Sequence, residues 1–155
     1  MKTAIPLLSA LLLLASHANA WCWDEASARF GIHVDLLKAT AKQESGMNPK
    51  AINVNANGTE DMGLMQINSG WLPQLKAFGI ERNDLFDACT SIQIGAWIMA
   101  QNMNRYGATW NAVGAYNVGC AKLSVAECQK RRSNYAWKIF RRLNRQQQEG
   151  INRAF

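Results

Sequence analysis

Residues 50–71, KAINVNANGTEDMGLMQINSGW, interrupt a chain whose other segments mostly follow helical patterns. Asparagine and glycine are dense in this insert and strong helix formers are sparse, so it favours a loop or a small hairpin. The flanking sequence shows helical periodicity, with no internal repeat and no linker-like run. We therefore predict one α+β domain that is predominantly α-helical and carries a small β/loop insert.

Helical patterns cover most of the chain on either side of the insert. A helix over residues 35–45 is expected to end at Gly46, because glycine commonly terminates helices and Pro49 prevents the helix from resuming. Residues 146–155 are polar and are expected to form a flexible tail. The other predicted helices cover residues 24–30, 71–79, 88–107, 109–119 and 133–145.

The first 20 residues have the pattern of a secretory signal peptide. Lys2 provides a positive start, residues 4–15 are apolar, and Ala18-Asn19-Ala20 matches a small-x-small cleavage site. The apolar run is shorter than the roughly 20 residues that span a bilayer, and no later stretch could span one. We therefore expect cleavage after Ala20, a periplasmic protein without stable membrane insertion, and a single domain over residues 21–155.

All four cysteines follow the leader, which favours two disulfide bonds formed in an oxidising compartment. Four cysteines allow three pairings, and the sequence does not choose among them. Our prediction is Cys120–Cys128, which closes a short loop, together with Cys22–Cys89, which ties the N-terminus to a central helix.

No metal site is predicted. A zinc site is disfavoured because no CxxC pair is present and His33 is the only histidine after the leader. The run from Asn53 to Gly58 resembles the opening of a calcium loop, but Leu64 occupies the twelfth position, where a bidentate glutamate is required. We interpret this stretch as an asparagine-rich turn.

The formal net charge is +6, and 8 of the 17 lysines and arginines stand between residues 130 and 153. A basic cluster can indicate nucleic-acid binding. An exported protein meets anionic wall polymers first, so we expect no nucleic-acid partner and interpret most of the cluster as a solvated helix face. The chain is expected to be a monomer.

Glu44 is expected in the last turn of a helix, where the helix dipole disfavours a negative charge. Val34, Leu37 and Ala41 are three and four residues apart and form one apolar stripe, which Glu44 continues toward the core. A carboxyl group in apolar surroundings has a raised pKa, which suits a general acid. On position alone, an ion pair or an exposed orientation explains Glu44 as well.

Three short motifs stand in order along the chain: ES at Glu44–Ser45, GLMQ at residues 63–66 and AYN at residues 115–117. In this order, behind a signal peptide, they are similar to the motifs of the lysozyme-like lytic transglycosylases with an SLT domain. The resemblance covers essentially the whole chain after the leader. The small size, the expected disulfides and the CWDEAS start resemble the stand-alone members that accompany secretion systems and pili, the invasion-protein type.

The resemblance implies a lysozyme-like fold and cleavage of the MurNAc–GlcNAc β-1,4 bond in the glycan strands of peptidoglycan. In this family one glutamate, here Glu44, first protonates the glycosidic oxygen and then accepts the proton of the muramic acid C6 hydroxyl, which closes a 1,6-anhydro ring. An internal nucleophile gains from proximity, so one carboxyl group can suffice and no cofactor is needed. The resemblance also implies local wall remodelling for a secretion or pilus apparatus, with a component of that apparatus as a partner.

The resemblance assigns substrate-binding residues around the catalytic carboxyl group. Gly63 would let a sugar approach the backbone, Gln66 would bond a hydroxyl or acetamido group, and Tyr116 would orient the carboxyl group. Core packing explains Met65 equally well, and helix-end hydrogen bonding explains Ser45. The complete set is Ser45, Gly63, Met65, Gln66, Tyr116 and Asn117.

Asp61 precedes the GLMQ motif and is a candidate second catalytic group. A second carboxylate could stabilise an oxocarbenium-like centre or position water, so a lysozyme-type hydrolase of the same bond is the alternative reaction. A solvated loop pair with Glu60 explains Asp61 as well. A non-catalytic wall-binding accessory protein, acting through its basic C-terminal helix, is the alternative from another functional class.

Overall fold

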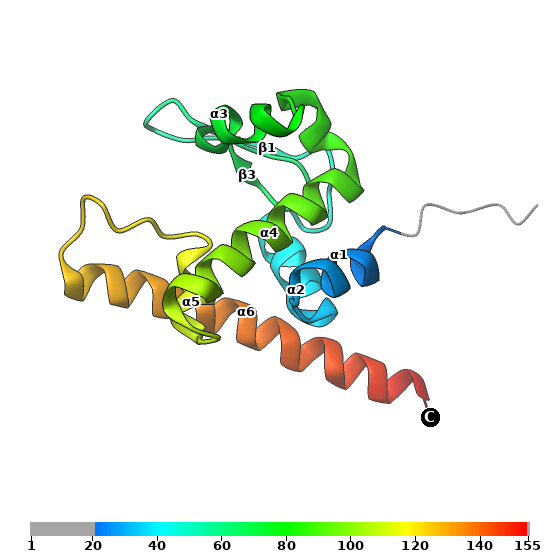
Figure 1. The fold of residues 1–155 in the computed structure, drawn as a ribbon. Coiled ribbons are helices and arrows are strands. Elements are labelled where there is room, and N and C mark those ends of the chain that lie inside the picture. The colour runs from blue at the N-terminus through cyan, green and yellow to red at the C-terminus, as the bar shows by residue number, and fades with distance from the viewer. Residues whose placement is uncertain (1–20, 155) are drawn as a thin grey trace, which may run out of the picture.

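The computed structural model describes residues 21–154, with side chains through residue 149. The expected signal peptide and its cleavage site lie outside these residues. Helices make up most of the described chain, and one small antiparallel sheet lies beside them (Figure 1). The predicted α+β, predominantly helical class is therefore confirmed.

Two short helices precede the insert, α1 (Trp23–Phe30) and α2 (Val34–Glu44). His33 caps the start of α2, where its Nδ1 accepts a hydrogen bond from the Asp35 amide at 3.2 Å. At the other end, the backbone amide of Ser45 donates to the Ala41 carbonyl at 3.0 Å. Both ends of α2 are thus closed by the residues that flank it, which satisfies backbone groups that a helix end leaves unpaired.

The insert forms a three-stranded antiparallel sheet in the order β1 (Ile52–Val54), β2 (Glu60–Met62) and β3 (Ile67–Asn68). The loop between β1 and β2 is the asparagine-rich turn that the sequence predicts. In it the Asn57 side chain accepts hydrogen bonds from the amide and hydroxyl of Thr59 at 3.1 and 2.8 Å. The turn between β2 and β3 meets the C-terminal end of α2, where the Ser45 hydroxyl donates to the Leu64 carbonyl at 2.7 Å.

Helix α4 (Ala88–Tyr106) runs through the middle of the molecule, with the sheet on one side and α1 and α2 on the other (Figure 1). The connection from β3 to α4 is a series of short turns: η1 (Ser69–Trp71), α3 (Leu72–Leu75), η2 (Lys76–Phe78) and η3 (Arg82–Phe86). The main core packs around α4 and includes the fully buried Leu37, Met62, Leu64, Met65, Ile92 and Met99.

Two further helices complete the fold, α5 (Trp110–Ala115) and α6 (Val125–Ala154). Residues from α2, α5 and α6 form a second small core of Ala39, Val113, Tyr135 and Ile139. Helix α5 ends before residue 119, where we expected its end. Residues 146–154, expected as a flexible tail, continue α6 as helix. Although α6 is long, no helix of the described chain combines the length and apolar character needed to cross a membrane.

Helix α6 begins earlier than expected, at a start capped by Ser124, whose hydroxyl accepts a hydrogen bond from the Glu127 amide at 3.2 Å. Further along, Arg132 anchors the first half of the helix. This arginine is 6% exposed, and its Nε donates to the Val118 carbonyl at 3.2 Å. Its guanidinium also lies 4.4 Å from the centre of the Tyr106 ring, a favourable cation–π distance. These contacts fasten the first half of α6 to the segment after α5 and to the end of α4.

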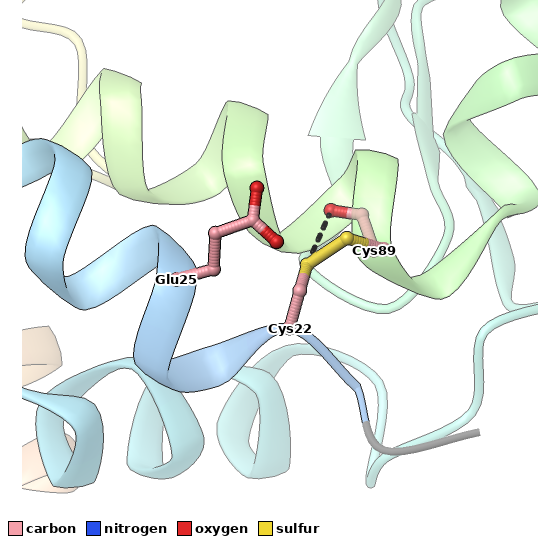
Figure 2. Close-up of side chains that lie close together, drawn as sticks. All are labelled: Cys22, Glu25 and Cys89. Carbon is pink, nitrogen blue, oxygen red and sulfur yellow. Dashed lines mark hydrogen bonds between the residues drawn. A yellow bond between two sulfur atoms is a disulfide. The ribbon is translucent and has the colours of Figure 1, made fainter. Parts of the chain in front are cut away.

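Two disulfide bonds join the predicted partners. Cys22–Cys89 links the start of α1 to the first turn of α4, and Cys120–Cys128 links the loop after α5 to α6. Figure 2 shows Glu25 beside the first bond. Candidate ligand atoms of Cys22, Glu25 and Cys89 lie within 4.8 Å of one another. Zinc is bound by cysteine thiolates, and sulfurs joined in a disulfide offer none, so this group is not a metal site.

Candidate active site

A cleft of about 680 Å³ opens between the insert and the helices. Residues from the end of α2, the β1–β2 loop, the sheet, α4 and the segment after α5 line it. They include Glu44, Asn55, Asp61, Gln66, Asn68, Trp71, Ile98, Tyr116 and Asn117. Segments far apart in the sequence thus converge on one space that carries carboxyl, amide and aromatic groups.

Glu44 lies in this cleft at the last position of α2. Burial disfavours its charged form and raises the pKa of the carboxyl group from 4.5 to about 7. A hydrogen bond from Tyr135 opposes the rise in this pKa, the negative charge of Asp61 adds to it, and the positive charge of Lys138 opposes it. Near neutral pH, Glu44 is therefore present in both protonated and ionised forms, as acid–base catalysis requires.

Tyr135 of α6 donates a hydrogen bond from its hydroxyl to Glu44 Oε1, across 91 residues of sequence. The ring is 5% exposed, and burial raises the pKa of the Tyr135 hydroxyl well above 10, so this group stays a donor. No motif in the sequence singled out Tyr135 as a functional residue. In the sequence, Tyr135 is an aromatic residue on the apolar face of the last predicted helix, and this pattern indicates core packing.

Tyr116 was expected to form a hydrogen bond that orients Glu44, and this prediction is wrong. The Tyr116 hydroxyl instead donates to the Met65 carbonyl at 2.9 Å. It ties the end of α5 to the GLMQ motif, and burial raises the pKa of this hydroxyl well above its usual value. Tyr116 still lines the cleft, so its expected contact with substrate stays a prediction.

Two residues of the GLMQ motif shape the cleft from behind. Met65 is fully buried, and its side chain fills the space beside Gly95 of α4, so it offers no surface to a sugar. Gly63 is buried with φ +74°, and a Cβ there would collide with the backbone carbonyl of Leu85. Glycine is needed here for close packing against η3, not for the approach of a sugar as we expected.

Gln66 and Ser45 hold the wall of the cleft together. Gln66 lines the cleft, and its Nε2 donates to the carbonyls of Gly63 and Ala51 at 3.0 and 3.2 Å. The Ser45 hydroxyl donates to the Leu64 carbonyl at 2.7 Å, which fastens the end of α2 to the GLMQ motif. Ser45 thus has a positioning role in the structure, and direct substrate binding by Gln66 stays a prediction.

Asp61 lies in the same cleft as Glu44. Its Oδ1 accepts a hydrogen bond from Asn68 Nδ2 at 2.7 Å, and its Oδ2 accepts one from Asn55 Nδ2 at 2.9 Å. Its neighbour Glu60 pairs with Arg82 at 2.9 Å outside the cleft. The two carboxylates are therefore not one solvated pair, and Asp61 is held by amide donors where it can face a bound substrate.

Two other side chains offer groups that suit a sugar. Trp71 lines the cleft, and its ring meets that of Trp97 edge-on at 5.5 Å. The sequence could not choose Trp71 among the tryptophans, since only the fold brings it to the cleft. Asn117, exposed at the rim, was expected to bind substrate, and its place in the lining is compatible with this.

The sequence is similar to known proteins over most of its length. The family model described as Transglycosylase SLT domain matches residues 21–139. The chain is 40% identical over 146 residues to Invasion protein IagB of Salmonella typhi, covering 92% of this chain and 91% of that protein. It is 41% identical over 134 residues to Protein IpgF of Shigella flexneri, covering 85% and 86% respectively.

The fold is similar to that of a larger solved structure. An inactive mutant of lytic transglycosylase Slt from Pseudomonas aeruginosa superposes with a TM-score of 0.62 at 19% identity. The match covers 81% of this chain and only 23% of the other. This likeness establishes the lysozyme-like fold expected from the motifs.

Proposed function

Because the chain belongs to the Transglycosylase SLT domain family, a family of peptidoglycan lytic transglycosylases, we propose that it cleaves the MurNAc–GlcNAc β-1,4 bond and forms 1,6-anhydro-MurNAc. The observation that carries the proposal is Glu44, whose pKa is raised to about 7 in a cleft walled by amides. A carboxyl group with this pKa can both donate and accept a proton near neutral pH.

The proposed reaction uses Glu44 twice. Its protonated carboxyl group donates the proton to the glycosidic oxygen as the bond from that oxygen to muramic acid C1 breaks. The resulting carboxylate then accepts the proton of the C6 hydroxyl while O6 bonds to C1, so the carboxyl group is restored and no water is consumed. The Tyr135 hydroxyl, bonded to Oε1, holds the carboxyl group in one orientation during both transfers.

Hydrolysis of the same bond is a second candidate reaction, favoured by the placement of Asp61. Its fixed carboxylate shares the cleft with Glu44 and could position a water molecule or stabilise positive charge at C1. The two reactions differ in product, since transglycosylation gives anhydro-muropeptides and hydrolysis gives reducing ends.

Product analysis on purified peptidoglycan tests the proposal. Wild-type protein is expected to release anhydro-muropeptides that mass spectrometry detects, and Glu44→Gln is expected to release none above background. Reducing ends in place of anhydro ends would favour the hydrolase. Normal cleavage by Glu44→Gln would contradict both reactions, because this change removes the transferable proton and keeps the size of the side chain.

The family's wall substrate and the two disulfide bonds support a periplasmic location, because disulfides persist in oxidising compartments. The similarity to the Invasion protein IagB supports a finer role, the local opening of glycan strands for a secretion or pilus apparatus. A strain lacking the protein should lose assembly of that apparatus. Wild-type protein should restore assembly, and Glu44→Gln should not.

A further inference from the structure

A second groove, of about 630 Å³, lies beside the catalytic cleft. Asn57, Asn117 and Gly119 line both, so the two spaces are continuous. The groove runs between the β1–β2 loop, the loop after α5 and the first half of α6. Figure 1 shows the two loops projecting on the same side of the molecule. The Cys120–Cys128 disulfide ties the second loop to α6.

This basic groove, as we call it, carries positive charge. Lys122, Arg131 and Lys138 line it, and no aspartate or glutamate is among its lining residues in the described chain. Arg131 is partly neutralised by Glu127, which accepts a hydrogen bond from its Nε at 2.7 Å. Neither lysine forms an ion pair with any residue whose side chain is described. Two unpaired ammonium groups in one groove favour an anionic ligand.

The basic groove begins beside the catalytic acid. The Tyr135 side chain lines it, and the hydroxyl of the same residue bonds to Glu44. Whatever occupies the groove beside Tyr135 therefore lies next to the residue that holds the catalytic acid. Muramic acid is the sugar whose C1 reacts, and it carries a short peptide on its lactyl group with free carboxylates.

We propose that the basic groove binds the carboxylates of this peptide stem, with Lys122 and Lys138 as the charged contacts. The proposal rests on the proposed function and adds a substrate requirement to it: stem-bearing glycan is preferred over glycan whose stems carry no negative charge. Asn57, Asn117 and Asn134 line the groove as well, and amide side chains can both donate to and accept from a peptide backbone.

Binding to the inactive Glu44→Gln protein tests the proposal without turnover. Calorimetry would compare short stem-bearing glycan oligomers with the same oligomers after their carboxylates are converted to primary amides. The free carboxylates are expected to bind about fivefold more tightly, the scale of exposed ion pairs. This preference should shrink as salt is raised, because exposed charges are screened.

A second variant locates the contact. Adding Lys122→Gln to the Glu44→Gln background should remove most of the preference for free carboxylates. The matched control is Lys130→Gln, since Lys130 is an exposed lysine of α6, the helix that follows Lys122, and does not line the groove. This control should keep the full preference.

The outcomes separate the two proposals. Equal affinity for both oligomers, or a preference that survives Lys122→Gln together with Lys138→Gln, would overturn the basic groove as a stem site and leave glycan cleavage untouched. Failure of Glu44→Gln to bind either oligomer would instead count against the proposed function itself.

Discussion

The catalytic cleft and the basic groove are neighbours with opposite character. The cleft holds two carboxyl groups, Glu44 and Asp61, and the groove holds lysines and an arginine. Lys138 is the groove residue whose charge acts on Glu44, and it lowers the pKa of that carboxyl group. The pKa of Glu44 is raised because burial and the charge of Asp61 outweigh the hydrogen bond from Tyr135 and this one cation. Charge for binding is kept mostly in the adjoining space.

Replacing Glu44, the acid of the cleft, is expected to have the largest effect on glycan cleavage. Glu44→Gln is expected to lower the rate of glycan cleavage at least about a thousandfold, because the proposed proton donor of the cleft is lost. Release of soluble muropeptides from sacculi measures the effect. The control Glu60→Gln changes a neighbouring carboxylate that pairs with Arg82, and it should cleave at the wild-type rate.

The same substitution should reveal what a buried acid costs in stability. The Glu44 carboxyl titrates near 4.5 when unfolded and about 7 when folded, so the folded chain holds more protons between these values. The free energy of unfolding should therefore fall as pH rises through this window. Glu44→Gln removes the dependence and should be more stable than wild type at pH 8, on the order of 2 kcal/mol.

Urea unfolding of both proteins at pH 4 and pH 8 measures this difference. At pH 4 the glutamate is neutral in both states, so the two proteins should have similar stability. A wild-type protein that matches Glu44→Gln at both pH values would contradict the raised pKa.

Asp61 is the second carboxylate of the cleft, and replacing it lowers the negative charge there. Asp61→Asn is expected to slow cleavage about tenfold, since a negative charge near the developing positive charge at C1 is lost. It should also move the high-pH limb of the rate profile to lower pH, because Asp61 raises the pKa of Glu44. Unchanged products would leave the transglycosylase mechanism standing. If wild-type protein forms hydrolytic products and Asp61→Asn forms anhydro products, Asp61 positions the water molecule that hydrolyses the bond.

Replacing Tyr135 is expected to have the smallest effect on the rate. It should shift the pH profile in the direction opposite to that of Asp61→Asn. Its hydrogen bond lowers the pKa of Glu44, so Tyr135→Phe should move the high-pH limb to higher pH. The rate should fall about fivefold as the carboxyl group loses its fixed orientation, with KM little changed. The control Tyr106→Phe removes a hydroxyl bonded to Arg132 and should leave the pH profile in place. If the pH dependence of the rate is the same in Tyr135→Phe as in wild type, Tyr135 contributes only to core packing.

Local patterns predicted much of this molecule. Apolar spacing placed Leu37 and Ala41 on the buried face of α2, and both are fully buried. The density of asparagine and glycine predicted the sheet insert, and Gly46 the end of α2. These features depend on neighbours in the sequence, so the backbone preferences of nearby residues suffice to predict them.

Contacts between distant segments were beyond such patterns. Met65 and Gly63 stand in a motif that suggests contact with sugar, yet η3 and α4 cover them and leave Gln66 at the surface of the cleft. Tyr135 gave no sign of its bond to Glu44, because that bond spans 91 residues.

Residue types at short spacing were enough to predict the helical class, the insert, the order of the motifs and an acid on an apolar stripe. Packing of distant segments was needed to settle which tyrosine bonds the acid, which motif residues reach the cleft, and that cations of α6 line the adjoining basic groove. Those outcomes depend on how separate helices pack, and a hydrogen bond or a shared groove exists only once packing has brought its members together.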